Sequence, residues 1–275
     1  MDFFDHHVRY LVFAHHNFPI HGYQRPVVLF LESNALISPF LSIVIPAHNE
    51  ETRLPRALGQ VFAFLENQKY ASEVVVVENA SSDRTLEVAQ KFTPYYPYLR
   101  ILHEDQSGKG RAIRRGMLEA RGEYRFFADV DFSMPVEEIS RFLPPACDCD
   151  IAIASREAPG AIRYDEPSYR HFTGRVFNFL IRTLVLPGLQ DTQCGFKSFR
   201  ASVAEDIFRF QTLPGWSFDV ELLAIARLHG YTIAEVGIPW YFNAASKVNI
   251  LCDSARMFFD LLTIRRNVRR GVYET

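Results

Sequence analysis

The sequence lacks a strong excess of either charge. Its 275 residues include 30 lysines and arginines against 32 aspartates and glutamates, so the formal net charge is −2. A nucleic-acid-binding domain usually carries a strongly basic balance, and this chain is therefore not expected to bind nucleic acid. Hydrophobic residues make up 48% and charged residues 23% of the chain, which is typical of a globular protein with a sizeable core.

Cysteine is also scarce. The four cysteines stand at positions 147, 149, 194 and 252, and no two of them form a CxxC pair. We therefore expect neither a zinc site nor a disulfide framework, and the pattern fits a reducing compartment.

Long hydrophobic runs are missing as well. No stretch reaches the ~18 to 20 consecutive apolar residues that a membrane span requires, and the nearest candidate, residues 26–47, is interrupted by Glu32, Ser33 and Asn34. Residues 1–39 lack a basic segment and a small-residue cleavage site, so no signal peptide is expected. We treat them as an N-terminal extension of unknown role, whose histidines lack the spacing and carboxylate partner of a metal site.

From residue 40 onward, apolar runs alternate with amphipathic segments. Strands are predicted at 40–47, 72–80, 98–104, 123–131 and 149–156, with helices at 48–67, 81–92 and 108–122 between them. A helix at 166–188, a short strand within 191–200, a helix at 216–230, a strand at 231–242 and a terminal helix at 249–271 follow. This alternation predicts an α/β fold with a Rossmann-like, mostly parallel sheet flanked by helices.

Polar residues follow the predicted strands, at the edge where open parallel sheets bind their ligands. The strand ends carry "PAHNE", "ENASSD", "HEDQSGKG" and "ADVD". Side chains at i and i+2 of an extended chain project to the same side, so Asp129 and Asp131 can share one Mg²⁺ or Mn²⁺ ion. The competing interpretation is that these acids only favour a turn. Their position at the functional edge favours the metal site.

Seven motifs in order resemble the family 2 glycosyltransferases of the GT-A fold. They are "SIVIPAHNE", "VVVENASSDRT", "GKGRAIRRGM", "FADVD", "DTQCGFKSF", "FDVELLAIARLHGY" and "SKV", spread over residues 40 to 270. Within the family, the chain looks like the polyprenyl-phosphate sugar synthases, in particular the dolichyl-phosphate β-glucosyltransferases. The resemblance implies an inverting, metal-dependent transfer of glucose from UDP-glucose to a polyprenyl (dolichyl-type) phosphate.

The resemblance also assigns site residues. At the donor nucleotide and its diphosphate it implies Pro46, Asn49, Glu50, Glu78, Asn79, Lys109, Asp129 and Lys247. At the sugar or the acceptor it implies Arg156, Arg175, Asp191, Gln193 and Lys197, and it gives catalytic roles to Asp131, Asp219, Arg156 and Arg175. The chain departs from the family in two places: Glu78-Asn79-Ala80-Ser81 replaces "DDGS", and Ser133-Met134 replaces the Gln-His of the mannosyl branch.

The expected chemistry leaves alternatives open. A cation on Asp129 and Asp131 would stabilise the charge of a departing diphosphate, and Lys109 would either assist or be a solvated loop lysine. A phosphate acceptor is already ionised near pH 7 and needs cationic positioning, by Arg156 and Arg175 or by Arg163 and Arg170 in the same segment. A hydroxyl acceptor needs a base, which Asp219 would supply. With a phosphate acceptor, Asp219 would orient a group or simply cap its helix.

The expected organisation has three parts. Residues 1–39 form the extension, residues 40–247 the GT-A domain, and residues 248–275 an amphipathic helix with a basic end. That helix can lie on an anionic bilayer, which would place the enzyme peripherally at the cytoplasmic membrane face, or it can be an ordinary packed helix. Other functions left open are transfer from GDP-mannose, transfer to a soluble hydroxyl acceptor, and a non-catalytic lipid- or nucleotide-binding module. The oligomeric state is not predicted.

Overall fold

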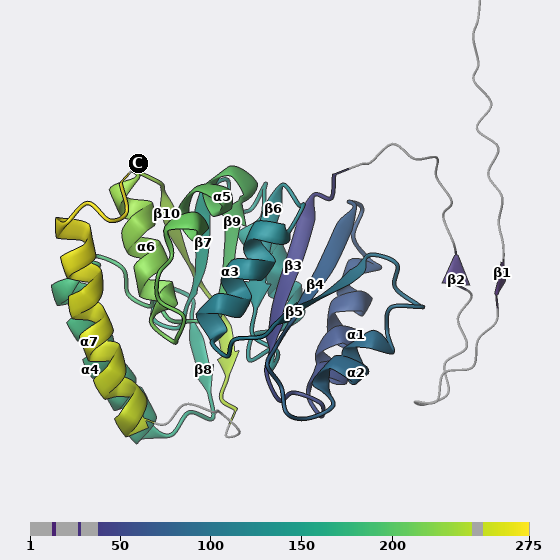
Figure 1. Cartoon of the computed structure of the whole chain (residues 1–275), viewed down its shortest axis with the longest axis horizontal. Coiled ribbons are helices and arrows are strands. Elements are labelled where there is room, and N and C mark those ends of the chain that lie inside the picture. The colour runs from purple at the N-terminus through teal and green to yellow at the C-terminus, as the bar shows by residue number, and fades with distance from the viewer. Residues whose placement is uncertain (1–12, 15–26, 29–37, 244–249, 275) are drawn as a thin grey trace, which may run out of the picture. The chain divides into compact units, whose positions relative to one another are not determined.

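The computed structural model describes residues 13–14, 27–28, 38–243 and 250–274 (Figure 1). The chain divides into two compact units, Met1–Ile37 and Ser38–Thr275. In the first unit, strand β1 (Phe13–Ala14) pairs antiparallel with β2 (Val27–Val28). The second unit contains the sheet and the site.

A seven-stranded sheet forms the centre of the second unit. Its strands, in spatial order, are β10 (Ile233–Gly237), β7 (Ile151–Ser155), β9 (Phe196–Arg200), β6 (Tyr124–Ala128), β3 (Leu41–Ala47), β4 (Ser72–Asn79) and β5 (Leu99–Glu104). Strand β9 runs antiparallel to β6 and β7, and the other neighbours are parallel. The predicted mostly parallel sheet is therefore confirmed. Its strands are covered on both faces, which explains their continuous apolar runs.

Alternate residues of each strand face two separate cores, because successive side chains point to opposite sides of a sheet. Ile43 and Ile45 belong to a core shared with helices α1 (Leu54–Leu65), α2 (Thr85–Gln90) and the 3-10 helix η1 (Val136–Phe142). Val44 belongs to the other core, with α3 (Lys109–Glu119), α5 (Ala201–Phe210) and α6 (Phe218–Leu228). Both faces of the sheet are thereby covered, and the carboxyl ends of the parallel strands share one edge.

Two long helices lie side by side at one end of the unit (Figure 1, left). Helix α4 (Ser168–Leu184) packs along α7 (Ile250–Arg269), and α7 buries Leu261 and Ile264 in the second core. No described helix is both long enough and apolar enough to cross a membrane. A small parallel sheet of β8 (Ile162–Tyr164) and β11 (Pro239–Tyr241) completes the unit.

Three details differ from the expectations. The strand predicted at 231–242 is two strands, β10 and β11, because the chain passes from the large sheet to the small one at the buried residue Ile238. Helices η1 and α5 were not predicted. The expectation of no disulfide was wrong for one pair: Cys147 is bonded to Cys149, with their Cα atoms 5.6 Å apart. A C-x-C spacing allows this bond although it is not a CxxC motif, so the cysteine pattern no longer supports a reducing compartment.

Candidate active site

The carboxyl ends of β3, β4, β6 and β7 meet at a cavity of about 710 Å³. This volume is in the range of cavities that bind small ligands. Ten of the candidate site residues named from the sequence line it: Pro46, Glu50, Asn79, Lys109, Asp129, Asp131, Arg156, Arg163, Gln193 and Asp219. The parallel topology thus brings together residues that lie up to 173 positions apart in the chain, between Pro46 and Asp219.

Asp129 and Asp131 both line the cavity, but not as neighbours on an extended strand. Strand β6 ends at Ala128, and the next four residues form a turn in which the Phe132 N–H donates to the Asp129 carbonyl oxygen at 3.2 Å. Phe132 has φ of 40°, and the Ser133 N–H donates to Asp131 Oδ1 at 3.3 Å. The two carboxylates therefore lie in a turn at the cavity, and their role in holding a metal ion stays a prediction. Burial, followed by the charge of Asp129, raises the pKa of Asp131.

Lys109 places a cation against this pair. Its Nζ lies 2.6 Å from Asp129 Oδ1 and 5.3 Å from the centroid of the Trp216 ring. Burial alone would lower the pKa of Lys109, but Asp129 and Asp219 outweigh burial and the pKa is raised. Lys109 therefore stays charged, as the first residue of α3, and it is not a solvated loop lysine.

Two glycines allow the close approach of backbone to these groups. A Cβ atom at Gly195 would lie 1.9 Å from Asp129 Oδ2. A Cβ atom at Gly108, whose φ is +150°, would lie 2.6 Å from the carbonyl oxygen of Pro214. Neither glycine was singled out in the sequence, although each flanks a residue that was.

Asp219 stands in the cavity wall with a buried partner behind it. The Lys197 Nζ donates to Asp219 Oδ1 at 2.6 Å and to the Cys194 carbonyl oxygen at 2.6 Å, and Lys197 has no exposed surface. Burial raises the pKa of Asp219, and the nearby lysines oppose the rise without cancelling it. Lys197 itself does not line the cavity, so its contact is with Asp219 and not with open space.

Two arginines that line the cavity share one aromatic ring. Arg156 donates from Nε and Nη2 to the buried carboxylate of Asp191, at 2.6 and 2.9 Å, and this pairing lowers the pKa of Asp191 to about 2 despite its burial. Arg163 pairs with Glu157 and Glu166 at 2.7 and 2.6 Å. The two guanidinium carbons lie 5.4 and 5.8 Å from the centroid of the Trp240 ring. Asp191 is therefore the partner of Arg156 and does not reach the cavity.

Asn49 and Glu78, two residues predicted at the donor, do not line the cavity. Asn49, with φ of 52°, accepts on its side-chain oxygen from the N–H groups of Ser82 and Asp83, at 2.8 and 3.3 Å. The Glu78 carboxylate accepts from the Ser81 N–H at 2.6 Å and pairs with His103. Both side chains hold the loops after β3 and β4 in place.

Arg175 and Lys247 are the remaining predicted residues. Arg175 is exposed on α4 and does not line the cavity, whereas Arg163, the alternative in the same segment, does. Lys247 lies outside the described residues. Residues that sequence reasoning missed include Arg53, Trp216 and Trp240. Each stands within six residues of a motif, and the two tryptophans of the chain are both in the cavity wall.

The formal charges of the wall favour a bound cation. Cationic side chains are Arg53, Lys109, Arg156, Arg163 and Arg256, and anionic ones are Glu50, Asp129, Asp131, Glu166, Asp219 and Asp260. Among the lining residues that the structure describes, five positive and six negative charges sum to −1, so a further cation would favour the binding of an anionic ligand. Within the described residues, no three acidic, histidine or cysteine side chains form a metal cluster. Asp129 and Asp131 therefore fit a hard divalent ion whose other ligands come from a substrate.

Comparisons with known proteins identify relatives of the chain. The family model described as glycosyl transferase family 2 matches residues 42–208. The dolichyl-phosphate beta-glucosyltransferase of Homo sapiens is 33% identical over 249 residues, covering 85% of this chain and 77% of the relative. The enzyme of the same name from Saccharomyces cerevisiae is 32% identical over 258 residues, covering 85% and 76%.

Solved structures share the fold. The crystal structure of glucosyl-3-phosphoglycerate synthase from Mycobacterium tuberculosis in complex with Mn²⁺, UDP-glucose and phosphoglyceric acid matches with a TM-score of 0.59 and 18% identity, covering 82% of this chain and 79% of that one. A second structure of that enzyme, with Mg²⁺ and UDP, matches with a TM-score of 0.56. The chain therefore has the GT-A fold.

Proposed function

Because the chain belongs to glycosyl transferase family 2, we propose that it transfers glucose, with inversion, from UDP-glucose to a polyprenyl phosphate of the dolichyl type. The observation that carries the proposal is that one cavity is lined by two distinct groups of charged side chains. One group is the carboxylate pair Asp129 and Asp131 with Lys109, and the other is Arg156 and Arg163 on Trp240. The first suits the diphosphate of a donor, and the second suits a phosphate acceptor.

On the donor side, Asp129 and Asp131 would hold Mg²⁺ or Mn²⁺. When bound, the ion neutralises the charge that develops on the departing diphosphate. Lys109 adds a second, fixed positive charge beside it, at the N-terminus of α3. Pro46, Glu50 and Asn79 would line the nucleoside part of the donor, with Asn49 and Glu78 holding their loops. Support comes from the similar fold whose structure contains Mn²⁺ and UDP-glucose.

On the acceptor side, a phosphate monoester already carries the negative oxygen that attacks the sugar, because its second pKa is near 6. No residue then has to remove a proton. Arg156 is held rigidly by Asp191 and would orient the phosphate, with Arg163 beside it in the role expected for Arg175. Gln193, also in the wall, would contact the sugar or the acceptor phosphate.

Transfer to a soluble hydroxyl is the second candidate, because Asp219 is in the wall and burial raises its pKa, as a general base requires. One of its oxygens, however, is held by Lys197, which favours a fixed negative charge over a proton acceptor. The substitution Asp219→Asn separates the two. A loss of turnover below about tenfold supports the phosphate acceptor, whereas a loss of about 10³-fold or more supports the base.

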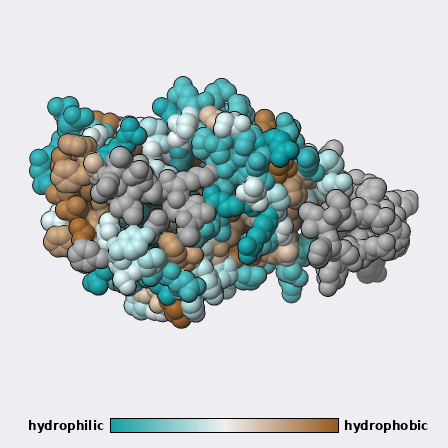
Figure 2. Space-filling view, turned by 90° about the horizontal axis from the view of Figure 1, so that it is seen from below, coloured by the Kyte–Doolittle hydropathy of each residue, from teal (hydrophilic) through white to brown (hydrophobic). Residues whose placement is uncertain are grey.

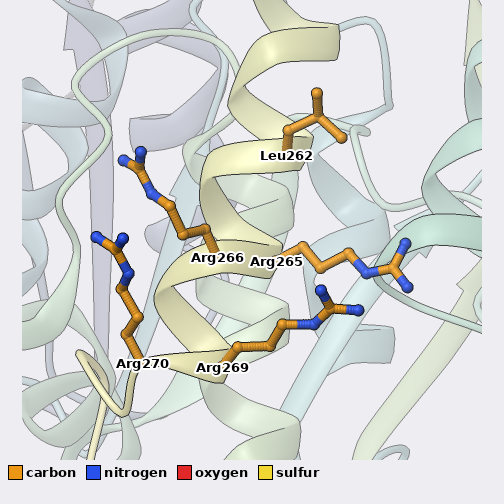
Figure 3. Close-up of a pocket in the computed structure, with 5 residues that line it drawn as sticks. All are labelled: Leu262, Arg265, Arg266, Arg269 and Arg270. Carbon is orange, nitrogen blue, oxygen red and sulfur yellow. The ribbon is translucent and has the colours of Figure 1, made fainter.

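We also propose that the enzyme associates peripherally with the cytoplasmic face of a membrane through α4 and α7. Hydrophobic residues gather at the end of the molecule where these helices lie (Figure 2, left). The exposed apolar side chains there are Tyr169, Val176, Phe179, Phe259 and Leu262. Farther along α7, Arg265, Arg266, Arg269 and Arg270 extend to two sides of the helix and line a hollow of about 530 Å³ (Figure 3). Apolar surface beside arginines suits an anionic bilayer.

The experiment that tests the proposal is transfer from UDP-[¹⁴C]glucose to a short polyprenyl phosphate with Mn²⁺ or Mg²⁺, with GDP-mannose in parallel. The variant Asp131→Asn removes one metal-binding carboxylate, and Glu137→Gln, an exposed carboxylate on η1, is the matched control. We expect metal-dependent labelled lipid from UDP-glucose, lost in Asp131→Asn and kept in Glu137→Gln. Absence of lipid product from either donor, together with metal-dependent donor binding, would refute the lipid acceptor. Absence of donor binding as well would favour a non-catalytic module.

A further inference from the structure

Arg256 differs from the other cationic side chains of the cavity. Arg53 pairs with Glu50, Lys109 with Asp129, Arg156 with Asp191 and Arg163 with Glu166, each within 2.6 Å. For Arg256, no carboxylate lies within ion-pair distance among the side chains that the structure describes, which do not include Asp253. Arg256 is exposed on α7, and it lines the cavity.

The acid one helical turn after Arg256 is engaged elsewhere. Asp260 follows Arg256 by four residues, a spacing at which the two side chains can meet. Instead, Asp260 Oδ2 accepts a hydrogen bond from Ser217 Oγ at 2.7 Å, at the start of α6. That contact ties α7 to the element that carries Asp219, and it leaves Arg256 for a ligand.

Two apolar side chains from α4 and α7 line the same cavity as Arg256. Met257 follows Arg256 on α7, Phe177 belongs to α4, and the two helices pack side by side. The groups that suit a donor diphosphate and its metal, Asp129, Asp131 and Lys109, come from other elements. A ligand that combines a phosphate with a hydrocarbon chain therefore suits the α4 and α7 residues of the cavity.

The arginine pair assigned to the acceptor is already matched by carboxylates. Arg156 and Arg163 carry two positive charges, and their partners Asp191, Glu157 and Glu166 carry three negative charges. This group sums to −1, so it can orient a phosphate dianion, but a further positive charge would strengthen the binding. Arg256 supplies such a charge, because no described carboxylate lies within ion-pair distance of it.

From these observations we propose that Arg256 binds the phosphate of the polyprenyl phosphate acceptor, and that Met257 and Phe177 contact the first part of its hydrocarbon chain. This inference rests on the proposed function and adds to it a binding residue on the terminal helix, which the sequence had indicated only as a membrane-facing element. Arg256 is a binding residue for the acceptor and takes no part in binding the donor.

The test compares Arg256→Gln with Arg256→Lys and with the control Arg56→Gln, an exposed arginine on α1 that does not line the cavity. For Arg256→Gln, KM for polyprenyl phosphate should rise about tenfold, as expected for loss of one charge-assisted hydrogen bond at an exposed position. KM for UDP-glucose should stay within twofold. Arg256→Lys should restore most of the loss, and Arg56→Gln should match the wild type.

Competition with the uncharged polyprenol isolates the phosphate contact. Arg256→Gln should weaken inhibition by a polyprenyl phosphate analogue and leave inhibition by the polyprenol unchanged. Equal effects on both inhibitors, or on both KM values, would overturn the inference, since they would indicate a structural role. An unchanged acceptor KM in Arg256→Gln, with an active wild type, would also overturn it while leaving the proposed function intact.

The inference can be tested even where the proposed function fails. If the wild type makes no lipid product, calorimetric binding of a short-chain polyprenyl phosphate to the wild type and to Arg256→Gln decides the matter. Equal or absent binding overturns the inference, whereas binding that weakens about tenfold in Arg256→Gln supports it. Thermal unfolding of each variant checks that the fold is retained.

Discussion

Replacing Gly195 by alanine should disable the site without unfolding the protein. The new Cβ atom would lie 1.9 Å from Asp129 Oδ2, and separations under 3.0 Å do not occur for real Cβ atoms. The carboxylate must therefore move by about 1 Å or more. Asp129 is the side chain that holds Lys109 at 2.6 Å and would hold the metal ion, so both contacts are lost together.

The magnitude follows from that displacement. A misplacement of about 1 Å at a reacting centre can reduce the rate about 10²-fold. The cost to stability should be small, because the atoms that meet the new methyl group are the outer end of an aspartate side chain, which can rotate away. Gly195 also has no positive φ, so alanine introduces no backbone strain there.

The assay measures turnover, the Mn²⁺ concentration that gives half-maximal rate, and the midpoint of thermal unfolding. The matched control is Gly215→Ala, since Gly215 lines the same cavity and a Cβ there meets nothing within 4 Å. We expect Gly195→Ala to lose about 10²-fold in kcat and to need more metal, with an unfolding midpoint close to that of the control. Turnover within threefold of Gly215→Ala would refute the reasoning that Asp129 needs its observed position.

Three further predictions concern charged pairs outside the cavity wall or behind it. Lys197→Met should lower the free energy of unfolding, measured in urea, by about 3 kcal/mol, because it leaves the buried charge of Asp219 without Lys197 as its partner. A decrease in the free energy of unfolding below about 1 kcal/mol would mean that the pair is not buried in solution. The pKa of Asp191 is lowered to about 2, so its contribution to stability is present above its ordinary value of 3.8 and declines as pH falls through about 2. Urea titrations from pH 5 to pH 2 should show that decline, and Asp191→Asn should flatten it. The hydrogen bond to Glu78 raises the pKa of His103, so the pair stabilises the fold fully below pH 6.5, and this contribution is lost as the pH rises through the raised pKa. The titration of His103 can be followed by NMR. In His103→Gln, the corresponding pH dependence of the free energy of unfolding should disappear.

The motif that contains Asp129 and Asp131 shows how much of the site the sequence predicts. An apolar run that stops at two acids predicts both strand β6 and the position of the acids at its carboxyl end. The cavity lies at the carboxyl ends of the parallel strands, as expected for an open sheet of this kind. The extended geometry assumed for them was wrong, since a turn begins at Asp129. The residues "ADVD" alone do not distinguish an extended strand from a turn, because the turn depends on the packing of Phe132. The centroid of the Phe132 ring lies 6.0 Å from that of Phe196, which belongs to β9 and is distant in the sequence.

The sequence alone could not tell which residues contact a substrate and which support another side chain that does. Lys197 and Asp191 stand in one motif, "DTQCGFK", and both were expected to touch substrate. In the fold they point away from the cavity and hold Asp219 and Arg156, which do line it. Whether a charged residue faces the ligand or the residue behind it depends on the register of β9 against β6 and β7, and that register is a tertiary property.

The close pairing of charges limits what the cavity can hold. The charges of the described lining residues sum to −1 with Arg256 included, and most of the cations are matched by carboxylates. A divalent ion on Asp129 and Asp131 would add positive charge for the donor, and Arg256, which has no described carboxylate at ion-pair distance, would bind the acceptor phosphate. Donor binding should therefore depend steeply on metal, whereas acceptor binding should depend on Arg256 and only weakly on metal. The two substrates would thus depend on different cations of one cavity, and each cation can be removed without removing the other.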